Sequence, residues 1–182
     1  MRSLLVLFLL NLSIFTLSAQ QFNTARILNP REISGAITPV VFNEGLNQIG
    51  IFLNGGFGLN HTTDIAVRYG VLEGRDYIGA DIEWAIKKSE RISFSLMSGM
   101  HKKDFFGFDA GLVASFPLGS NIYIFSGVDV DVNFERETQH YIWVPIGIEA
   151  YWRKNLSVIF EIDLPMSEWA GDMFGGGIIM YL

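Results

Sequence analysis

The chain has 182 residues, a formal net charge of −6 and no cysteine. This acidic balance, with no run rich in lysine or arginine, argues against nucleic-acid binding, which requires a basic face. Without cysteine there is neither a disulfide framework nor a thiolate metal site. The length fits one domain, and the composition is unusually apolar, with 49% hydrophobic and 14% aromatic residues.

The first residues, MRSLLVLFLLNLSIFTLSAQQ, have the layout of a secretory signal peptide. Arg2 supplies a basic start, an apolar stretch runs from Leu4 to Leu17, and small residues end at Ala19. A membrane anchor is the alternative, but the stretch is short and contains Asn11 and Ser13. We therefore expect residues 1–19 to be cleaved and residues 20–182 to form one exported domain.

The rest of the chain alternates between apolar and polar residues with a period of two, in segments separated by polar or glycine-containing turns. Such alternation predicts β-strands. The segments are 32–42, 47–59, 64–72, 77–87, 91–101, 105–116, 121–134, 140–152, 156–165 and 173–182. Pro39 interrupts the first segment and makes it the weakest.

The two faces of these segments differ in kind. In 121–134, Ile122, Val128 and Val130 share one face, while Asp129 and Asp131 share the other. The polar faces are rich in small residues and short acids, and lysine collects in the turns instead. This pattern suits the narrow interior of a small barrel better than a solvated sheet surface. Aromatic residues near strand ends would form an interfacial girdle; they are Tyr69, Trp84, Phe106, Phe116, Phe134 and Trp152.

The signal peptide, the segments of about ten alternating residues and the final stretch MFGGGIIMYL together resemble a small bacterial outer-membrane β-barrel protein. The resemblance implies an all-β fold: a closed antiparallel up-and-down transmembrane barrel of ten strands. The alternative is eight strands, with the first segments outside the barrel or plugging its lumen. Both termini would be periplasmic.

The same resemblance implies the outer membrane of a Gram-negative bacterium as the location. It also implies outer-membrane lipid and the barrel-assembly machinery as partners. That machinery often recognises an aromatic last residue, whereas here Tyr181 is second to last and Leu182 is last. The SAQQ ending of the signal peptide is similar to those common in Bacteroidota.

The inward faces are predicted to be acidic. With Asp64, the candidate lumen carboxylates are Asp81, Glu83, Asp109, Asp129, Asp131, Glu149, Glu161 and Asp163. Arg68 and Arg91 are their expected basic partners, and His101 is expected near the outer rim. Clustered carboxylates attract cations, and hard divalent cations prefer several oxygen ligands.

We therefore expect a non-enzymatic protein without a cofactor, either structural, with a packed polar lumen, or narrow and porin-like with a preference for cations. One alternative is a barrel enzyme with His101 and His140 at the rim near Asp104, Glu135 and Glu137, although no GxSxG motif supports it. Another is a soluble lipocalin-like barrel that binds an apolar ligand.

Overall fold

A computed structural model describes residues 23–43, 47–72, 75–103, 105–134, 138–168 and 170–182. The predicted signal peptide lies outside these residues. The strands are β1 (Ile33–Asn43), β2 (Asn47–Asn60), β3 (Thr63–Leu72), β4 (Arg75–Lys88), β5 (Ser93–Lys102), β6 (Phe106–Pro117), β7 (Ile122–Phe134), β8 (Thr138–Arg153), β9 (Leu156–Pro165) and β10 (Asp172–Tyr181). No helix in the described part of the chain is long and apolar enough to cross a membrane.

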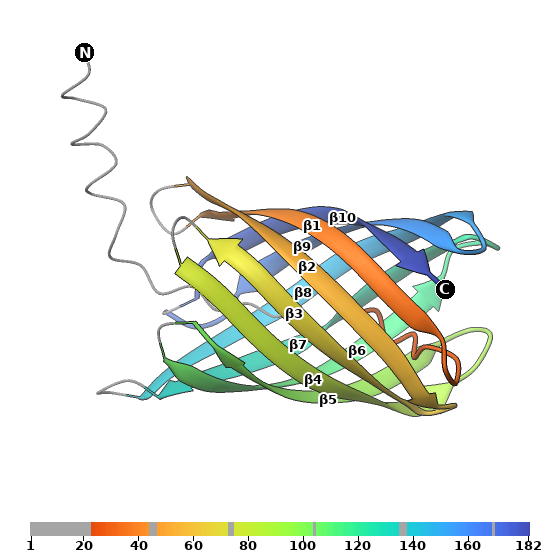
Figure 1. The fold of residues 1–182 in the computed structure, drawn as a ribbon, viewed down its shortest axis with the longest axis horizontal. Helices are drawn as coiled ribbons and strands as arrows, with labels where there is room; N and C mark the ends of the chain where they lie inside the picture. The colour runs from red at the N-terminus through yellow and green to blue at the C-terminus, as the bar shows by residue number, and fades with distance from the viewer. Residues whose placement is uncertain (1–22, 44–46, 73–74, 104, 135–137, 169) are drawn as a thin grey trace, which may run out of the picture.

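The ten strands close into one antiparallel barrel (Figure 1). Each strand pairs with its neighbours in sequence, and β1 closes the circle by pairing with β10. Closure gives every strand two partners, which is the condition for a sheet to be stable in lipid. We call the end where β1 begins and β10 ends the terminal end, and the opposite end the distal end.

The seam between β1 and β10 accommodates Pro39. The pairing runs from Ile37 opposite Ile178 to Val40 opposite Gly175, without regular partners for the two residues between them in β1. Proline has no N–H to donate to a ladder, so a local irregularity is expected at this position. A side chain at Gly177 would meet the Ile37 carbonyl oxygen at 2.6 Å from its Cβ, which explains glycine at the seam.

The barrel is apolar outside and polar inside. Outward side chains remain exposed, as shown by Val67 at 60%, Ile78 at 61% and Phe106 at 64%. Inward polar side chains are buried, with Ser95 at 0% and Asp131 at 2%. A soluble lipocalin-like barrel would place these two classes the other way round, so that alternative is wrong. The aromatic residues predicted for the girdle all lie on the exposed outer surface.

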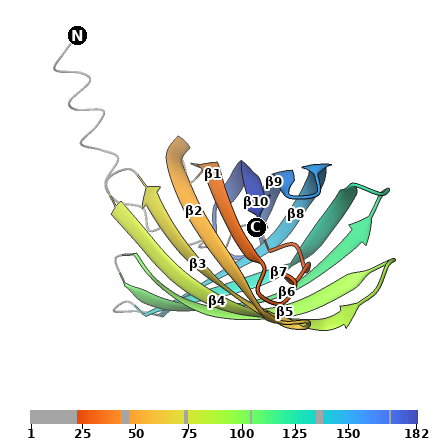
Figure 2. The same ribbon diagram turned by 45° about the vertical axis from the view of Figure 1, so that its right-hand side comes forward.

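The segment before β1, residues 23–32, lies inside the barrel on the terminal side (Figure 2). Ala25 is only 2% exposed, and the Leu28 N–H donates to Asp64 at 2.9 Å. Ala25 and Arg31 have φ angles of 53° and 69°. Non-glycine residues rarely adopt these values, and they persist where the surroundings hold the chain in place. We call residues 23–32 the inserted segment.

The ten predicted strands are confirmed, with every boundary within two residues of its expected position. The eight-strand alternative is wrong, because the first two segments are strands of the wall. A plug is nevertheless present, and it comes from the irregular chain that precedes them.

The outer surface generates a prediction. Leu112 lies near the middle of β6 and points outward, 47% exposed. Replacing it by arginine should lower the free energy of unfolding from bilayers by about 2–4 kcal/mol, because a charge would then face lipid near the midplane. Trp152→Arg, near the end of β8, should cost much less. Urea unfolding in liposomes measures both losses. If Leu112→Arg and Trp152→Arg lower the free energy of unfolding by the same amount, the outer surface at Leu112 does not face the lipid midplane.

Candidate functional site: the acidic lumen

The wall brings three predicted acids into one row across four strands. Asp81 of β4 pairs with Gly99 of β5, Gly99 pairs with Asp109 of β6, and Asp109 pairs with Asp131 of β7. Side chains at paired positions point to the same face of a sheet. The three carboxylates therefore lie at one level inside the barrel.

Gly99 provides the space in which two of these carboxylates converge. A Cβ at this position would lie 2.2 Å from Asp109 Oδ1 and 2.3 Å from Asp81 Oδ1. Both oxygen atoms thus occupy the volume that a side chain would fill. The glycine is needed here for close approach rather than for an unusual backbone angle.

Arg68 is the cation closest to this pair. Its Nη2 lies 2.7 Å from Asp81 Oδ2, and both side chains are almost completely buried. Arg68 Nη2 also donates to Asn23 Oδ1 of the inserted segment at 3.4 Å. Arg68 therefore compensates the buried charge of Asp81, because removing one partner of a buried ion pair leaves the other charge uncompensated.

His101 is the second basic group of the row. Its Nδ1 lies 3.4 Å from Asp109 Oδ2, and its Nε2 lies 2.9 Å from Asn133 Oδ1 and 3.5 Å from Asp131 Oδ1. Both ring nitrogens therefore face oxygen acceptors, an arrangement that suits a ring with two N–H donors. The ring stacks on Tyr77 with centroids 5.5 Å apart.

A separate cluster surrounds Glu149 at the terminal end. Its carboxylate accepts from the Tyr181 hydroxyl at 2.6 Å and the Ser157 hydroxyl at 2.7 Å, and it pairs with Arg26 at 3.3 Å. The guanidinium carbon of Arg26 lies 3.8 Å from the centroid of the Tyr123 ring. The inserted segment thus brings a cation that compensates a fully buried acid.

Further contacts fix the inserted segment along its length. The Ser115 hydroxyl donates to the Thr24 carbonyl, and the Asn23 amide contacts the Met97 sulfur. Lys88 Nζ reaches the Ile27 carbonyl at 3.5 Å. The segment therefore contacts side chains from β4, β5 and β6 and occupies the lumen on the terminal side.

The distal side of the lumen is filled by apolar side chains. The cluster comprises Val40, Phe42, Phe52, Leu72, Tyr77 and Met173. These side chains lie on the inner faces of their strands, as the acids do; Tyr77 and Asp81, for example, share the inner face of β4. The acidic row therefore lies between the apolar cluster on the distal side and the inserted segment on the terminal side, where a space of about 540 Å³ remains beside Arg26, Tyr123 and Tyr151.

The remaining predicted acids also point inward. Glu83 accepts from the Ser95 hydroxyl, and Asp129, Glu161 and Asp163 are at most 5% exposed. Glu161 and Asp163 lie two positions apart on β9, so they share its inner face. Within the described part of the chain, however, no group of three or more His, Asp or Glu side chains is arranged to hold a metal ion.

Two sequence predictions need correction. Arg91 is exposed in the turn before β5, because that strand begins at Ser93 and not at residue 91. His101 is 3% exposed inside the barrel, whereas His140 is exposed on the outer side of β8. The two histidines are therefore on opposite sides of the wall and do not form the rim pair expected for an enzyme.

Other residues of that expected rim site, Asp104, Glu135 and Glu137, lie outside the described residues. Arg26, by contrast, is a lumen residue that the sequence analysis missed. It lies in a segment without strand periodicity, so no pattern indicated the direction of its side chain.

These features define a class of protein: a closed ten-stranded antiparallel transmembrane β-barrel with an apolar outer surface and buried carboxylate side chains inside. The fold is that of bacterial outer-membrane barrels. An outer membrane channel from Pseudomonas putida F1 aligns with 90% of this chain and 100% of its own, at 6% identity and a TM-score of 0.62. The KdgM porin aligns with 81% of this chain and 98% of its own, at 7% identity and a TM-score of 0.52.

Another structure of the KdgM porin, in complex with disordered oligogalacturonate, aligns with 82% of this chain and 98% of its own. The identity is 10% and the TM-score is 0.51. Identities this low establish the fold alone. No protein-family model matches the sequence, and no curated protein matches it.

The ion pair of Arg68 generates a prediction. Arg68→Ala should lower the free energy of unfolding by about 3–5 kcal/mol, because Asp81 would remain buried without its cation. Unfolding in urea, followed by heat-modifiable migration on SDS gels, measures this loss. Arg91→Ala, which removes an exposed arginine, should leave stability unchanged. The account of the lumen fails if both variants unfold alike.

Proposed function

We propose that this chain is a non-enzymatic outer-membrane barrel of a Gram-negative bacterium, with a narrow, cation-preferring lumen that the inserted segment closes. Outer-membrane lipid would surround it, and the barrel-assembly machinery would insert it. The porin and channel folds to which it is similar support this class of function. The supporting observation within the molecule is the charge of the lumen.

Nine carboxylate side chains of the described residues are buried. They extend from Glu149 at the terminal end to Asp163 near the distal end. The basic groups among them are Arg68, His101 and the partly buried Arg26. Rings and rows of carboxylates lower the energy of a cation in a pore and raise that of an anion. Any ionic path along this lumen would therefore favour cations.

The inserted segment would act as the closure of that path. It is held by hydrogen bonds and one partly exposed ion pair rather than by a strand ladder, and such contacts open more readily than the barrel wall. A purely structural barrel is the second candidate, favoured by the two clusters of apolar side chains packed within the lumen. Conductance separates the two candidates.

Conductance in planar bilayers tests the cation preference. Under a KCl gradient the purified protein should give small conductances with a reversal potential that indicates K⁺ over Cl⁻. Asp109→Asn combined with Asp131→Asn should reduce this preference several-fold, because both acids lie in the central row. Asp172→Asn, at an exposed position at the start of β10, is the matched control. An anion preference would contradict the proposal, and no conductance at all would support the structural candidate.

A cross-link tests the closure. The chain has no cysteine, so Thr24→Cys with Ser115→Cys introduces the only thiols, at two positions whose side chain and backbone are in contact. Joining them with a disulfide or a short thiol cross-linker should reduce conductance. Reduction of the disulfide should restore it. If conductance is the same before and after reduction, the inserted segment is not the closure.

A further inference from the structure

The space of about 540 Å³ at the terminal end of the lumen is open to solvent. Lys88, Glu90 and Lys154, which are exposed at that end of the barrel, form part of its lining. Deeper in the space the lining is Arg26, Tyr123, Tyr151 and Tyr181. The Arg26 side chain is 29% exposed, so a small solute can reach its surroundings. With both termini periplasmic, this solute would come from the periplasm.

Two tyrosine rings and one carboxylate hold the guanidinium of Arg26. The guanidinium carbon lies 3.8 Å from the centroid of the Tyr123 ring and 4.7 Å from that of Tyr151. The two rings meet at 76° and form a corner. Arg26 Nη1 reaches Glu149 Oε2 at 3.3 Å, and Tyr181 stacks on Tyr151 with centroids 5.6 Å apart. We call Tyr123, Glu149, Tyr151 and Tyr181 the cation cage.

The wall builds this cage from its own strands. Tyr123 of β7 pairs with Glu149 of β8, and Tyr151 follows Glu149 by two positions, so all three share the inner face. The hydroxyl groups of Tyr181 and Ser157 both donate to Glu149 Oε1, at 2.6 and 2.7 Å. The wall therefore orients the carboxylate, and its other oxygen faces Arg26. A site whose groups are already in place loses little entropy when it binds a ligand.

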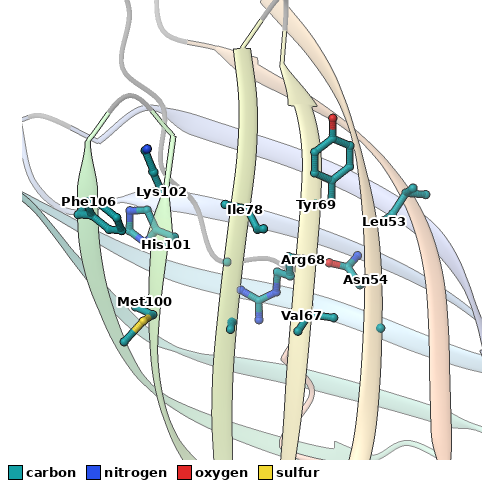
Figure 3. Close-up of a pocket in the computed structure, with 13 residues that line it drawn as sticks. Leu53, Asn54, Val67, Arg68, Tyr69, Ile78, Met100, His101, Lys102 and Phe106 are labelled. Carbon is teal, nitrogen blue, oxygen red and sulfur yellow. The ribbon is translucent and has the colours of Figure 1, made fainter.

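The occupant of the cage comes from the inserted segment. Arg68 and His101, the basic groups that the wall itself supplies to the lumen, lie on β3 and β5 (Figure 3). Both contact acids of the central row, whereas Glu149 lies on β8. Arg26 is thus a cation carried into a site that belongs to other elements.

The chemistry of the cage selects a guanidinium. Faces of aromatic rings attract cations, and an anion would be repelled by the fully buried carboxylate of Glu149. A planar guanidinium can lie on a ring face while its N–H groups reach a carboxylate, which a compact ammonium does less well. The Arg26 side chain makes both kinds of contact here.

We propose that the cation cage is a binding site for a guanidinium-bearing solute, and that Arg26 occupies it as an internal ligand. A free guanidinium that enters from the terminal end makes the contacts of Arg26 and displaces it. The step from displacement to opening of the lumen rests on the proposed function. Binding to the cage is measured without conductance, so the two proposals can fail separately.

Arg26→Ala empties the cage and leaves its walls in place. In equilibrium dialysis this variant should bind methylguanidinium, which is the end of an arginine side chain. N-methylurea, a neutral molecule of similar shape, should not bind. The native chain should bind methylguanidinium about tenfold more weakly than the variant, because Arg26 competes. Equal binding of the two probes by Arg26→Ala, or equal binding of methylguanidinium by variant and native chain, would overturn the proposal.

Refolding gives a second measurement if Arg26→Ala folds poorly. The variant leaves the buried Glu149 without its cation, which is destabilising. Methylguanidinium at low millimolar concentration should then raise the folded fraction seen by heat-modifiable migration on SDS gels, and N-methylurea should not. A low folded fraction that methylguanidinium leaves unchanged would be evidence against the cage.

Variants of the cage in the Arg26→Ala background locate the bound cation. Glu149→Gln should abolish methylguanidinium binding, because it removes the paired charge. Tyr123→Leu should weaken binding by about tenfold, because it removes one ring face. Tyr69→Leu, on the outer surface of β3, is the matched control and should change nothing. If Glu149→Gln and Tyr123→Leu bind as tightly as Tyr69→Leu, the cation does not bind in the cage.

Discussion

The structure depends on one constraint: each strand shows one face to lipid and the other to a closed lumen. Side chains alternate along a strand, so an apolar outer face fixes the direction of every polar residue on that strand. The acids cannot turn outward without placing charge in hydrocarbon, which is costly. Their concentration inside the barrel is therefore a consequence of the fold, and compensating their charge becomes the main requirement on the interior.

The interior meets that requirement in two ways. Arg68 and His101 are carried by the wall itself and contact the central acids directly. Arg26 arrives from outside the wall, on a segment that must enter the lumen before it can pair with Glu149. The negative charge of Glu149 is therefore compensated by Arg26 only while the inserted segment lies in the lumen. This links the electrostatics of the barrel to its closure, because withdrawing the segment would also leave Glu149 without its cation.

The sequence predicted most of the wall. Successive side chains of a strand point to opposite faces, so a sheet between lipid and lumen requires apolar and polar residues to alternate with a period of two. The sequence also predicted the inward direction of the acids, from Asp64 on β3 to Asp163 on β9. It failed where periodicity carries no information. Arg91 has the correct parity but precedes its strand, and the inserted segment has no repeating pattern at all. The inward aromatic residues, such as Phe52 and Tyr77, were hidden among apolar runs that suit either face.

The central claim, that lipid lies outside and the packed lumen inside, can be measured residue by residue. Because the chain has no cysteine, a nitroxide label can be placed singly at each position from 106 to 116 on β6 in liposomes. The account predicts that accessibility to oxygen, which partitions into lipid, alternates and is high at even positions. A water-soluble relaxation agent should reach none of the central even positions. Higher exposure of those positions to the water-soluble agent than to oxygen would contradict the account.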